Sequence, residues 1–136
     1  MALEVHVVTP ERELWSGEAR LLVARGTDGE VGIMNGHAPL LVRLDVGALR
    51  VHTERGEEVV VIDGGFLHVS TEEGTTRADV LADGAELASE VDVAAARQRA
   101  SEASDRLDAR DGLEPDERER LQRELDKANA RLAIAG

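Results

Sequence analysis

The residues of this chain best suited to chemistry lie in one glycine-rich stretch, DGEVGIMNGHAPLL, which runs from Asp28 to Leu41. The stretch places the carboxylate of Glu30 and the imidazole of His37 among three glycines, with Pro39 close behind. Residues of these types can cradle a phosphate with backbone N–H groups, hold a metal ion, or bring the backbone close to another protein. The rest of the sequence decides which of the three is expected.

The stretch lacks the features of a phosphate or metal site. No Gly-Lys-Ser/Thr follows its glycines, and it leads into strands rather than opening a helix. The four histidines, His6, His37, His52 and His68, are scattered, with no HxxxH or HxH pair that could bind a metal ion. His6, His52 and His68 alternate with apolar residues and are expected to face solvent. The chain has no cysteine, which excludes thiolate sites. We therefore expect no metal ion and no cofactor.

Catalytic arrangements are also missing from the sequence. No serine lies in a GxSxG turn, and no sequence argument pairs the scattered carboxylates for acid–base catalysis. We therefore expect no enzymatic activity from the chain itself. Two interpretations of the glycine-rich stretch stay open. It is either a loop that docks against another backbone, with Pro39 stiffening its exit, or an internal turn with a hydrogen-bonded histidine.

The overall composition limits the classes of partner. A length of 136 residues suits one domain, or a small domain with an appendage. The formal net charge of -12 argues against nucleic acid, because phosphate backbones are bound by arginine and lysine. No run of about 18 apolar residues is present, and the N-terminus does not resemble a signal peptide. We expect a cytoplasmic protein that does not insert into a bilayer.

Glycine usage divides the chain near Gly84, since eleven of its 13 glycines lie at or before that residue. Six short segments rich in valine and leucine precede the division and are predicted to be strands: LEVHVVT, ARLLVAR, ALRVHT, EVVVID, FLHVST and RADVLA. Turns about every 8 to 12 residues are typical of a sandwich. We predict an antiparallel β-sandwich over residues 1–84, with a tight turn at Gly64 and Gly65 and with Trp15 partly buried.

Beyond this division the apolar period becomes helical. The first predicted helix runs from about Asp92 to Arg110, with Ser89 or Asp92 as its N-cap. Pro115 suits the first turn of a second helix. The apolar positions of the two helices are Val93, Ala96, Ala100, Ala103 and Leu107, and then Leu121, Leu125, Ala128, Leu132 and Ala135. Residues 85–136 are thus predicted to form an antiparallel α-helical hairpin, and the fold class is α+β.

The hairpin has few large side chains to bury. Alanine occupies half of its apolar positions, so the two helices can approach closely but gain little from burial. Because ordering the chain costs about 1 to 2 kcal/mol per residue, we expect the hairpin to depend on what it packs against. A switchable arm is the corresponding hypothesis.

Three segments resemble one family. GEVGIMNGHAPLL is similar to the GEIGILPGHAPLL segment of the epsilon subunit of bacterial F-type ATP synthases. VVVIDGGFLHV looks like the second signature of that family, and VVTPERELWSGEA matches its first hairpin in kind. The resemblance spans essentially the whole chain. Asn35 departs from it, because many members have proline there, but asparagine tolerates turn conformations and we expect the loop to keep its shape.

The resemblance implies a non-catalytic rotor subunit in the central stalk of a proton-translocating ATP synthase. It would be peripheral, on the cytoplasmic face of the bacterial plasma membrane, with the gamma subunit and the ring of c subunits as partners. By the same resemblance, Glu30, Gly32 and Gly36 would dock on the c ring. Gamma would be contacted by Thr9, His37, Ala38 and Pro39. In the family, the helical arm either folds down on the sandwich or extends along gamma toward the alpha and beta catalytic subunits, where it inhibits ATP hydrolysis.

Some members of this family bind ATP through an Ile/Leu-Asp-x-x-Arg-Ala motif and basic residues of the second helix. This chain keeps the aspartate as Asp92 but has Ala95 in place of the arginine. Arg123 and Lys127 match the second-helix basic residues. Loss of the guanidinium removes a fork of donors suited to phosphate, so we expect weak or absent ATP binding. The alternative to a stalk subunit is a stand-alone nucleotide or small-ligand sensor.

Overall fold

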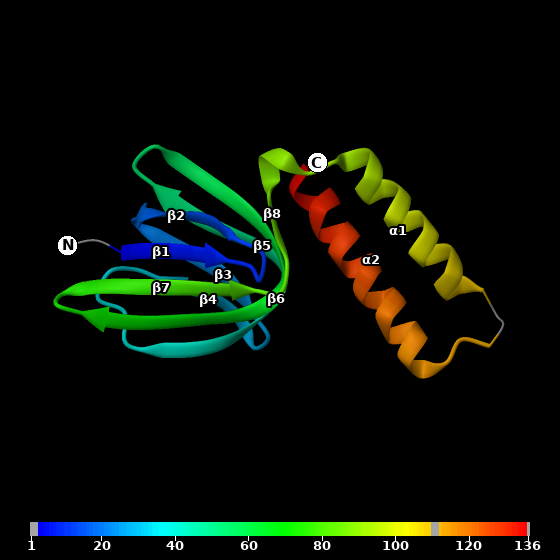
Figure 1. Cartoon of the computed structure of the whole chain (residues 1–136), viewed down its shortest axis with the longest axis horizontal. Coiled ribbons are helices and arrows are strands. Elements are labelled where there is room, and N and C mark those ends of the chain that lie inside the picture. Colours follow the sequence, from blue (N-terminus) through cyan, green and yellow to red (C-terminus); the bar gives the residue numbers. More distant parts are fainter. Residues whose placement is uncertain (1–2, 110–111, 136) are drawn as a thin grey trace. The chain divides into compact units, whose positions relative to one another are not determined.

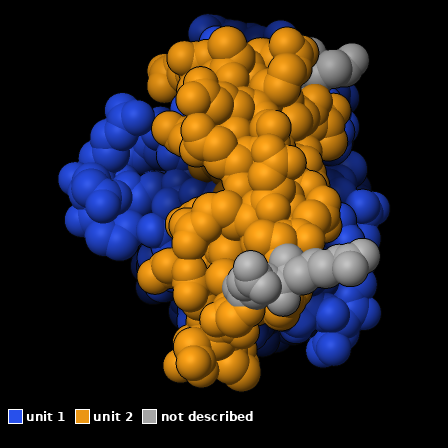
Figure 2. Space-filling view, turned by 90° about the vertical axis from the view of Figure 1, so that its right-hand side faces the viewer, with its two compact units in different colours: residues 1–89 blue, residues 90–136 orange. Residues whose placement is uncertain are grey.

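The computed structural model describes residues 3–109 and 112–135, which form two compact units. The units are Met1–Ser89 and Glu90–Gly136 (Figure 2). The first contains the strands and the second the two α-helices, so the predicted α+β class, a β-sandwich followed by a helical hairpin, is confirmed. The boundary predicted at Gly84 falls before the last strand, and the sandwich unit extends a few residues further than the glycine content indicated.

The strands of the first unit form one continuous network of hydrogen-bonded neighbours (Figure 1). Their order across the network is β2-β1-β7-β6-β5-β3-β4, and β8 pairs separately with β6. The bounds are β1 (Leu3–Val8), β2 (Glu13–Ala19), β3 (Leu21–Gly26), β4 (Gly29–Ile33), β5 (Leu40–Thr53), β6 (Gly56–Glu72), β7 (Thr75–Ala82) and β8 (Ala85–Leu87).

Two long strands, β5 and β6, each belong to both layers of the sandwich. Residues 40–44 of β5 pair with residues 65–69 of β6, and residues 46–53 pair with residues 56–63, with a break between the two sets. The strand β7 pairs only with the second half of β6, whereas β8 pairs only with its first half. Folding these two strands over at the break therefore produces the two layers (Figure 1).

The predicted tight turn at Gly64 and Gly65 is wrong. Both residues lie inside β6, where their φ angles of 92° and 141° bend the strand without ending it. At Gly65 a Cβ atom would collide with the carbonyl oxygen of Leu81 and would lie 2.9 Å from the Cα of Ala82. Glycine is therefore required at Gly65 both for its backbone conformation and for the close approach of β7.

The core follows from strict alternation along the strands. In β1, Leu3, Val5 and Val7 are fully buried between the layers, while the residues between them point outward. One pairing differs from the prediction of an antiparallel sandwich, because β1 runs parallel to β7 while pairing antiparallel with β2. The strand β4 was also missed, since its glycines made this segment look like a loop.

The second unit contains α1 (Val93–Asp108) and α2 (Pro115–Ala135), with a short 3₁₀ turn η1 (Ala88–Glu90) at the junction. Asp92 is the N-cap, as one of the two predicted alternatives had it, and its Oδ1 accepts the N–H of Ala95 at 3.0 Å. The helix α1 ends at Asp108, slightly before the predicted Arg110, which lies outside the described residues. Pro115 begins α2 as predicted.

The two helices pack through the small residues of the predicted seam. Ala96, Ala103, Leu121 and Ala128 are buried, while Val93 at one end stays 36% exposed. Near the other end, Arg106 Nη2 donates to Glu117 Oε1 at 2.7 Å and joins α1 to α2. Alanine thus supplies three of these four buried seam residues, and Leu121 is the large apolar side chain among them.

Replacing Gly65 is expected to be costly. Gly65→Ala forces an unfavourable φ and a backbone collision, so we expect a loss of more than about 3 kcal/mol of unfolding free energy. Gly32→Ala is the matched control, because a Cβ there meets only Leu21 Cδ1 at 3.7 Å and no positive φ is needed. Urea unfolding of the three proteins measures the effect. Equal stability of the Gly65→Ala and Gly32→Ala variants would contradict this account of the bend.

Candidate docking surface

The second half of the glycine-rich stretch forms a tight turn between β4 and β5. The N–H of His37 donates to the carbonyl of Met34 at 3.1 Å, which closes a four-residue turn. Gly36 has a φ of 90° at the third position of this turn, where type II turns require glycine or asparagine. Asn35 occupies the second position, at which proline is favoured. Gly36 at the third position therefore fits a type II turn, and the residues of the turn itself determine its shape.

Thr76, near the start of β7, holds this turn against the sandwich. Its side-chain oxygen accepts the N–H of Gly36 at 2.7 Å, and its own N–H donates to Oδ1 of Asn35 at a longer 3.4 Å. Thr76 itself is completely buried. The turn is thus attached to a buried residue of a central strand, which limits its freedom to move.

The turn is open to solvent despite this attachment. Met34 is 61% exposed, and Asn35, Gly36, Ala38 and Pro39 are exposed as well. His37 is half-buried, and its Nδ1 lies 2.7 Å from the carbonyl oxygen of Ala38. Of the two interpretations left open by the sequence, the hydrogen-bonded histidine agrees with the internal turn, and the exposure of the turn keeps the docking loop open. The surface is accessible to a partner.

Glu30 and Gly32 lie in β4 and not in the turn. The strand β4 forms the edge of the network beyond β3, where Glu30 is opposite Arg25 and Gly32 is opposite Val23. Both are exposed, and no ion pair joins Glu30 to Arg25. Glu30 and Gly36 are therefore separated by the length of β4. Of the three residues expected to dock on the c ring, Glu30 and Gly32 thus lie on the edge strand and Gly36 lies in the turn.

Thr9 lies apart from the other residues expected to contact gamma. It is in the turn between β1 and β2, is only 8% exposed, and its hydroxyl donates to the carbonyl of Arg12 at 3.1 Å. The opposite end of β1 is next to Thr76, where the turn containing His37 is attached. About 17 Å of strand separates the two ends at about 3.3 Å per residue. Thr9 mainly stabilises its own turn.

Sequence reasoning missed an exposed apolar strip on the outer face of the sandwich. We define the outer strip as Leu41, Phe66 and Leu81, which are 67%, 45% and 51% exposed. Phe66 lies opposite Arg43 on one side and Leu81 on the other, and the guanidinium of Arg43 is 6.0 Å from the centroid of its ring. The available signal was one large apolar residue at an outward position of each of three adjacent strands.

His6 is held between two carboxylates on the same outer face. Its Nδ1 lies 2.9 Å from Glu13 Oε1 and its Nε2 lies 2.8 Å from Glu4 Oε1, so β1 and β2 are linked across their surface. The hydrogen bond to Glu13 raises the pKa of His6 above its ordinary value of 6.5; burial opposes the shift, and the hydrogen bond to Glu4 adds to it. His6, expected to face solvent freely, is instead mostly covered.

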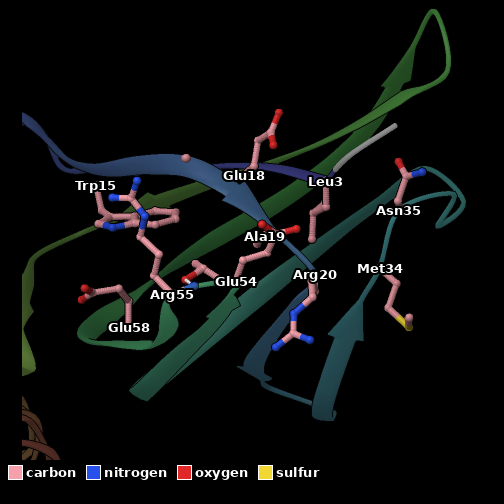
Figure 3. Close-up of a pocket in the computed structure, with 12 residues that line it drawn as sticks. Leu3, Trp15, Glu18, Ala19, Arg20, Met34, Asn35, Glu54, Arg55 and Glu58 are labelled. Carbon is pink, nitrogen blue, oxygen red and sulfur yellow. Dashed lines mark hydrogen bonds between the residues drawn. The ribbon is translucent and has the colours of Figure 1, made fainter.

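A groove of about 910 Å³ runs beside β2 and the turn between β5 and β6 (Figure 3). Trp15 lines it and packs against the sandwich core, as predicted, with its ring lying over Gly17. The rim carries both signs of charge, including Arg20 and Arg55 with three glutamates. The groove has no converging set of polar groups of one kind, and we assign it no function.

In the helical unit, the residues nominated for ATP are Asp92 at the start of α1 and two basic residues one turn apart on α2, Arg123 and Lys127. The carboxylate of Asp92 is used as the helix cap. Counting along the antiparallel helices from the Arg106–Glu117 contact places Asp92 level with Arg131 and Arg123 about 12 Å further along the axis. Within residues 3–109 and 112–135, no group of three His, Cys, Asp or Glu side chains is placed to hold a metal ion. In the same ranges neither helix could span a bilayer.

Comparison with known proteins decides the family. Residues 2–88 match the family model described as "ATP synthase, Delta/Epsilon chain, beta-sandwich domain". The chain belongs to the ATP synthase delta/epsilon family. It is 35% identical to the ATP synthase epsilon chain of Trichodesmium erythraeum, covering all of this chain and 97% of that relative. It is 41% identical to the epsilon chain of Rhodococcus jostii, covering 79% of this chain and 86% of the relative.

Solved structures of ATP synthases from two organisms share the fold of this delta/epsilon family member. One match is a chain of the Euglena gracilis mitochondrial ATP synthase, in a structure of the OSCP/F1/c-ring assembly. Its TM-score is 0.83 at 22% identity, covering 99% of this chain and 82% of that one. A chain of the Tetrahymena thermophila central stalk and c ring matches with a TM-score of 0.67 at 15% identity, covering 100% and 98%. At these identities the similarity establishes the fold.

The link between His6 and its carboxylates is expected to make stability depend on pH. Because the folded-state pKa is raised, the imidazolium contributes stability that is fully present below the ordinary value of 6.5 and is lost as pH rises through the folded-state pKa. In urea unfolding over a range of pH, His6→Gln should be less stable than the wild type at acidic pH, and the difference should shrink at alkaline pH. His68→Gln, at an exposed position, is the control. A difference for His6→Gln that stays constant with pH would count against the ionic link.

Proposed function

We propose that this chain is a central-stalk rotor subunit of a bacterial proton-translocating ATP synthase, joining gamma to the c ring at the cytoplasmic face of the plasma membrane. The relatives named epsilon chain support this proposal, as do structural neighbours solved within rotor assemblies. The observation that carries it is the outer strip, which continues into the exposed turn at residues 34–39. The subunit catalyses nothing and contributes binding surface.

The outer strip is the surface proposed to contact gamma. Leu41, Phe66 and Leu81 expose large apolar areas on adjacent strands, as a protein-binding patch does. Burial of each side chain on binding is worth roughly 1.5 to 3 kcal/mol before the costs of association. Leu41 is the second residue of β5 and lies two residues after Pro39, so the turn containing His37 leads directly into the strip, and the two are proposed to form one surface. That surface includes Ala38 and Pro39, and Thr9 lies at its other end, directly after Val8, which pairs with Leu81 of the strip.

The edge strand β4 is proposed to face the c ring. Its glycines leave the outer side flat, and Glu30 presents a carboxylate with no ion-pair partner among the described residues. A carboxylate of this kind can make a charge-assisted hydrogen bond to an arginine of a partner. Gly36, at the far end of β4, would extend the same contact along the turn. The flat edge thus allows close approach while Glu30 supplies specificity.

The helical unit is proposed to act as an inhibitory arm on the alpha and beta catalytic subunits. It forms a compact unit of its own, separate from the sandwich, and its seam is filled mostly by alanine. A unit with so little buried apolar area has a small energy difference between alternative packings, as a two-state element requires. Because Ala95 replaces the motif arginine and Asp92 caps α1, we propose that ATP binds weakly or not at all.

Polar substitution in the outer strip is expected to weaken binding to gamma. The double variant Phe66→Ser, Leu81→Ser removes two central apolar contacts, and we expect the dissociation constant to rise at least about a hundredfold. Glu54→Ala, in the exposed turn after β5, is the control and should bind as the wild type does. Surface plasmon resonance with purified gamma gives the constants. Wild-type affinity of the double variant would remove the basis of this proposal.

Removal of the helical unit tests the inhibitory arm. A chain ending at Ser89 keeps the whole sandwich unit and should still assemble with gamma and the c ring. We expect the reconstituted ATP synthase to hydrolyse ATP several times faster with this chain than with the full chain, while proton pumping stays coupled. Unchanged hydrolysis with normal assembly would argue against inhibition. Failure of both chains to assemble, with a nucleotide response of the free chain, would favour a stand-alone sensor.

A further inference from the structure

Asn35 and Gly36 form a dipeptide that is open to a specific chemical change. An asparagine side chain can be attacked by the backbone nitrogen of the next residue, and glycine at that position offers no side chain to shield the nitrogen. Asn35 is exposed to solvent and lies at the rim of the groove beside β2, with its side chain directed away from Met34 (Figure 3). The chain has one other asparagine, Asn129, which is followed by alanine and lies within α2.

We propose that Asn35 is a site of spontaneous deamidation and that its contacts with Thr76 set the rate. Deamidation belongs to the covalent changes that alter the charge of a side chain without any enzyme. Asparagine is among the thermally labile residues for this reason. The site lies in the turn at the centre of the proposed docking surface, so the product changes that surface.

The reaction needs only water and balances without an oxidant. The Gly36 N–H gives its proton to solvent hydroxide, and the nitrogen attacks Cγ of Asn35. The bond from Cγ to Nδ2 breaks, and ammonia leaves with a proton taken from water. The resulting five-membered succinimide is opened by water at one of its two carbonyls. Opening at one carbonyl gives aspartate, and opening at the other gives isoaspartate, in which the backbone passes through the former side chain.

The two hydrogen bonds with Thr76 oppose the attack. The Gly36 N–H is directed at Thr76 Oγ1, 2.7 Å away, so its proton is engaged and its nitrogen is held. The side-chain oxygen Oδ1 of Asn35 accepts the Thr76 N–H at 3.4 Å, which restrains the side-chain amide that must rotate onto the nitrogen of Gly36. Cyclisation therefore requires these contacts to open. Because Thr76 is completely buried in β7, the restraint is rigid but consists of two bonds only.

Deamidation would alter the docking surface in two ways, a consequence that rests on the proposed function. Either product adds a negative charge to a chain whose net charge is already -12. Isoaspartate also lengthens the backbone within the turn, so the hydrogen bond from His37 to Met34 can no longer close the same ring. The turn, and the position of His37 next to the outer strip, would then change.

The rate at Asn35 is measured by incubating the full chain at mildly alkaline pH and following each asparagine by peptide mapping with mass spectrometry. Thr76→Val keeps the volume but removes Oγ1, and we expect it to accelerate deamidation about fivefold, the factor for loss of one hydrogen bond. Thr76→Ser restores the hydroxyl and should return the wild-type rate. A peptide covering residues 34–39 should react faster than either, and Asn129 should stay intact throughout.

Three results would overturn the proposal. One is an equal rate in the wild type and Thr76→Val, and another is a folded wild type that reacts as fast as the peptide. The third is an intact Asn35 in both folded proteins after the peptide has reacted completely. The second result needs only the wild type and the peptide, so the proposal can be tested even if Thr76→Val does not fold.

The consequence for docking is tested separately with the isoaspartyl protein, isolated by ion exchange. A gamma–c-ring assembly depleted of this subunit is the probe, and we expect it to retain the isoaspartyl protein less than the intact protein. Equal retention would overturn the consequence for docking. If the intact protein is not retained at all, the proposed function fails while the deamidation result stands.

Discussion

The bend of β5 and β6 is the constraint on which the remainder of the structure depends. Two strands serve both layers because β6 bends at Gly64 and Gly65, at the break between the two sets of residues that pair with β5. The close approach of β7 at Gly65 brings the outward residues of three adjacent strands onto one face. It also places Thr76 beside the turn that follows β4. The outer strip and the turn from Met34 to Pro39, called the docking turn below, are therefore both produced by one backbone arrangement.

Much of the fold could be predicted from the sequence, because it depends on periodicity and local capping. Alternation identified β1, and the aspartate and proline at the starts of the helices were both recognisable, with Asp92 and Pro115 found where expected. Properties that depend on distant contacts could not be predicted. A glycine pair looks the same in a turn and in a bent strand, and only its pairing with Leu44 of β5 and Ala82 of β7 makes Gly65 part of a strand. The parallel pairing of β1 with β7 is of the same kind.

Only the part of the candidate docking site that is defined by local turn residues could be predicted from the sequence. Sequence reasoning found the residues of the turn from Met34 to Pro39, since glycine and proline mark turns locally. The outer strip was missed because Leu41, opposite His68, and Phe66, opposite Arg43, come onto one face only through pairing of distant strands. Thr9 was placed with the docking residues by resemblance alone, and its hydrogen bonds with Arg12 stabilise the turn between β1 and β2. A rigid sandwich that presents one surface, joined to a weakly packed helical unit, suits a subunit that transmits force and also regulates.

The central claim is that one continuous surface, the docking turn and the outer strip, binds the rotor. Hydrogen–deuterium exchange of the chain, free and assembled with gamma and the c ring, tests this most directly. The account predicts that protection on assembly is concentrated in residues 30–43, 64–69 and 79–82. Protection confined to the groove beside β2, with unchanged exchange in the docking turn and outer strip, would contradict it.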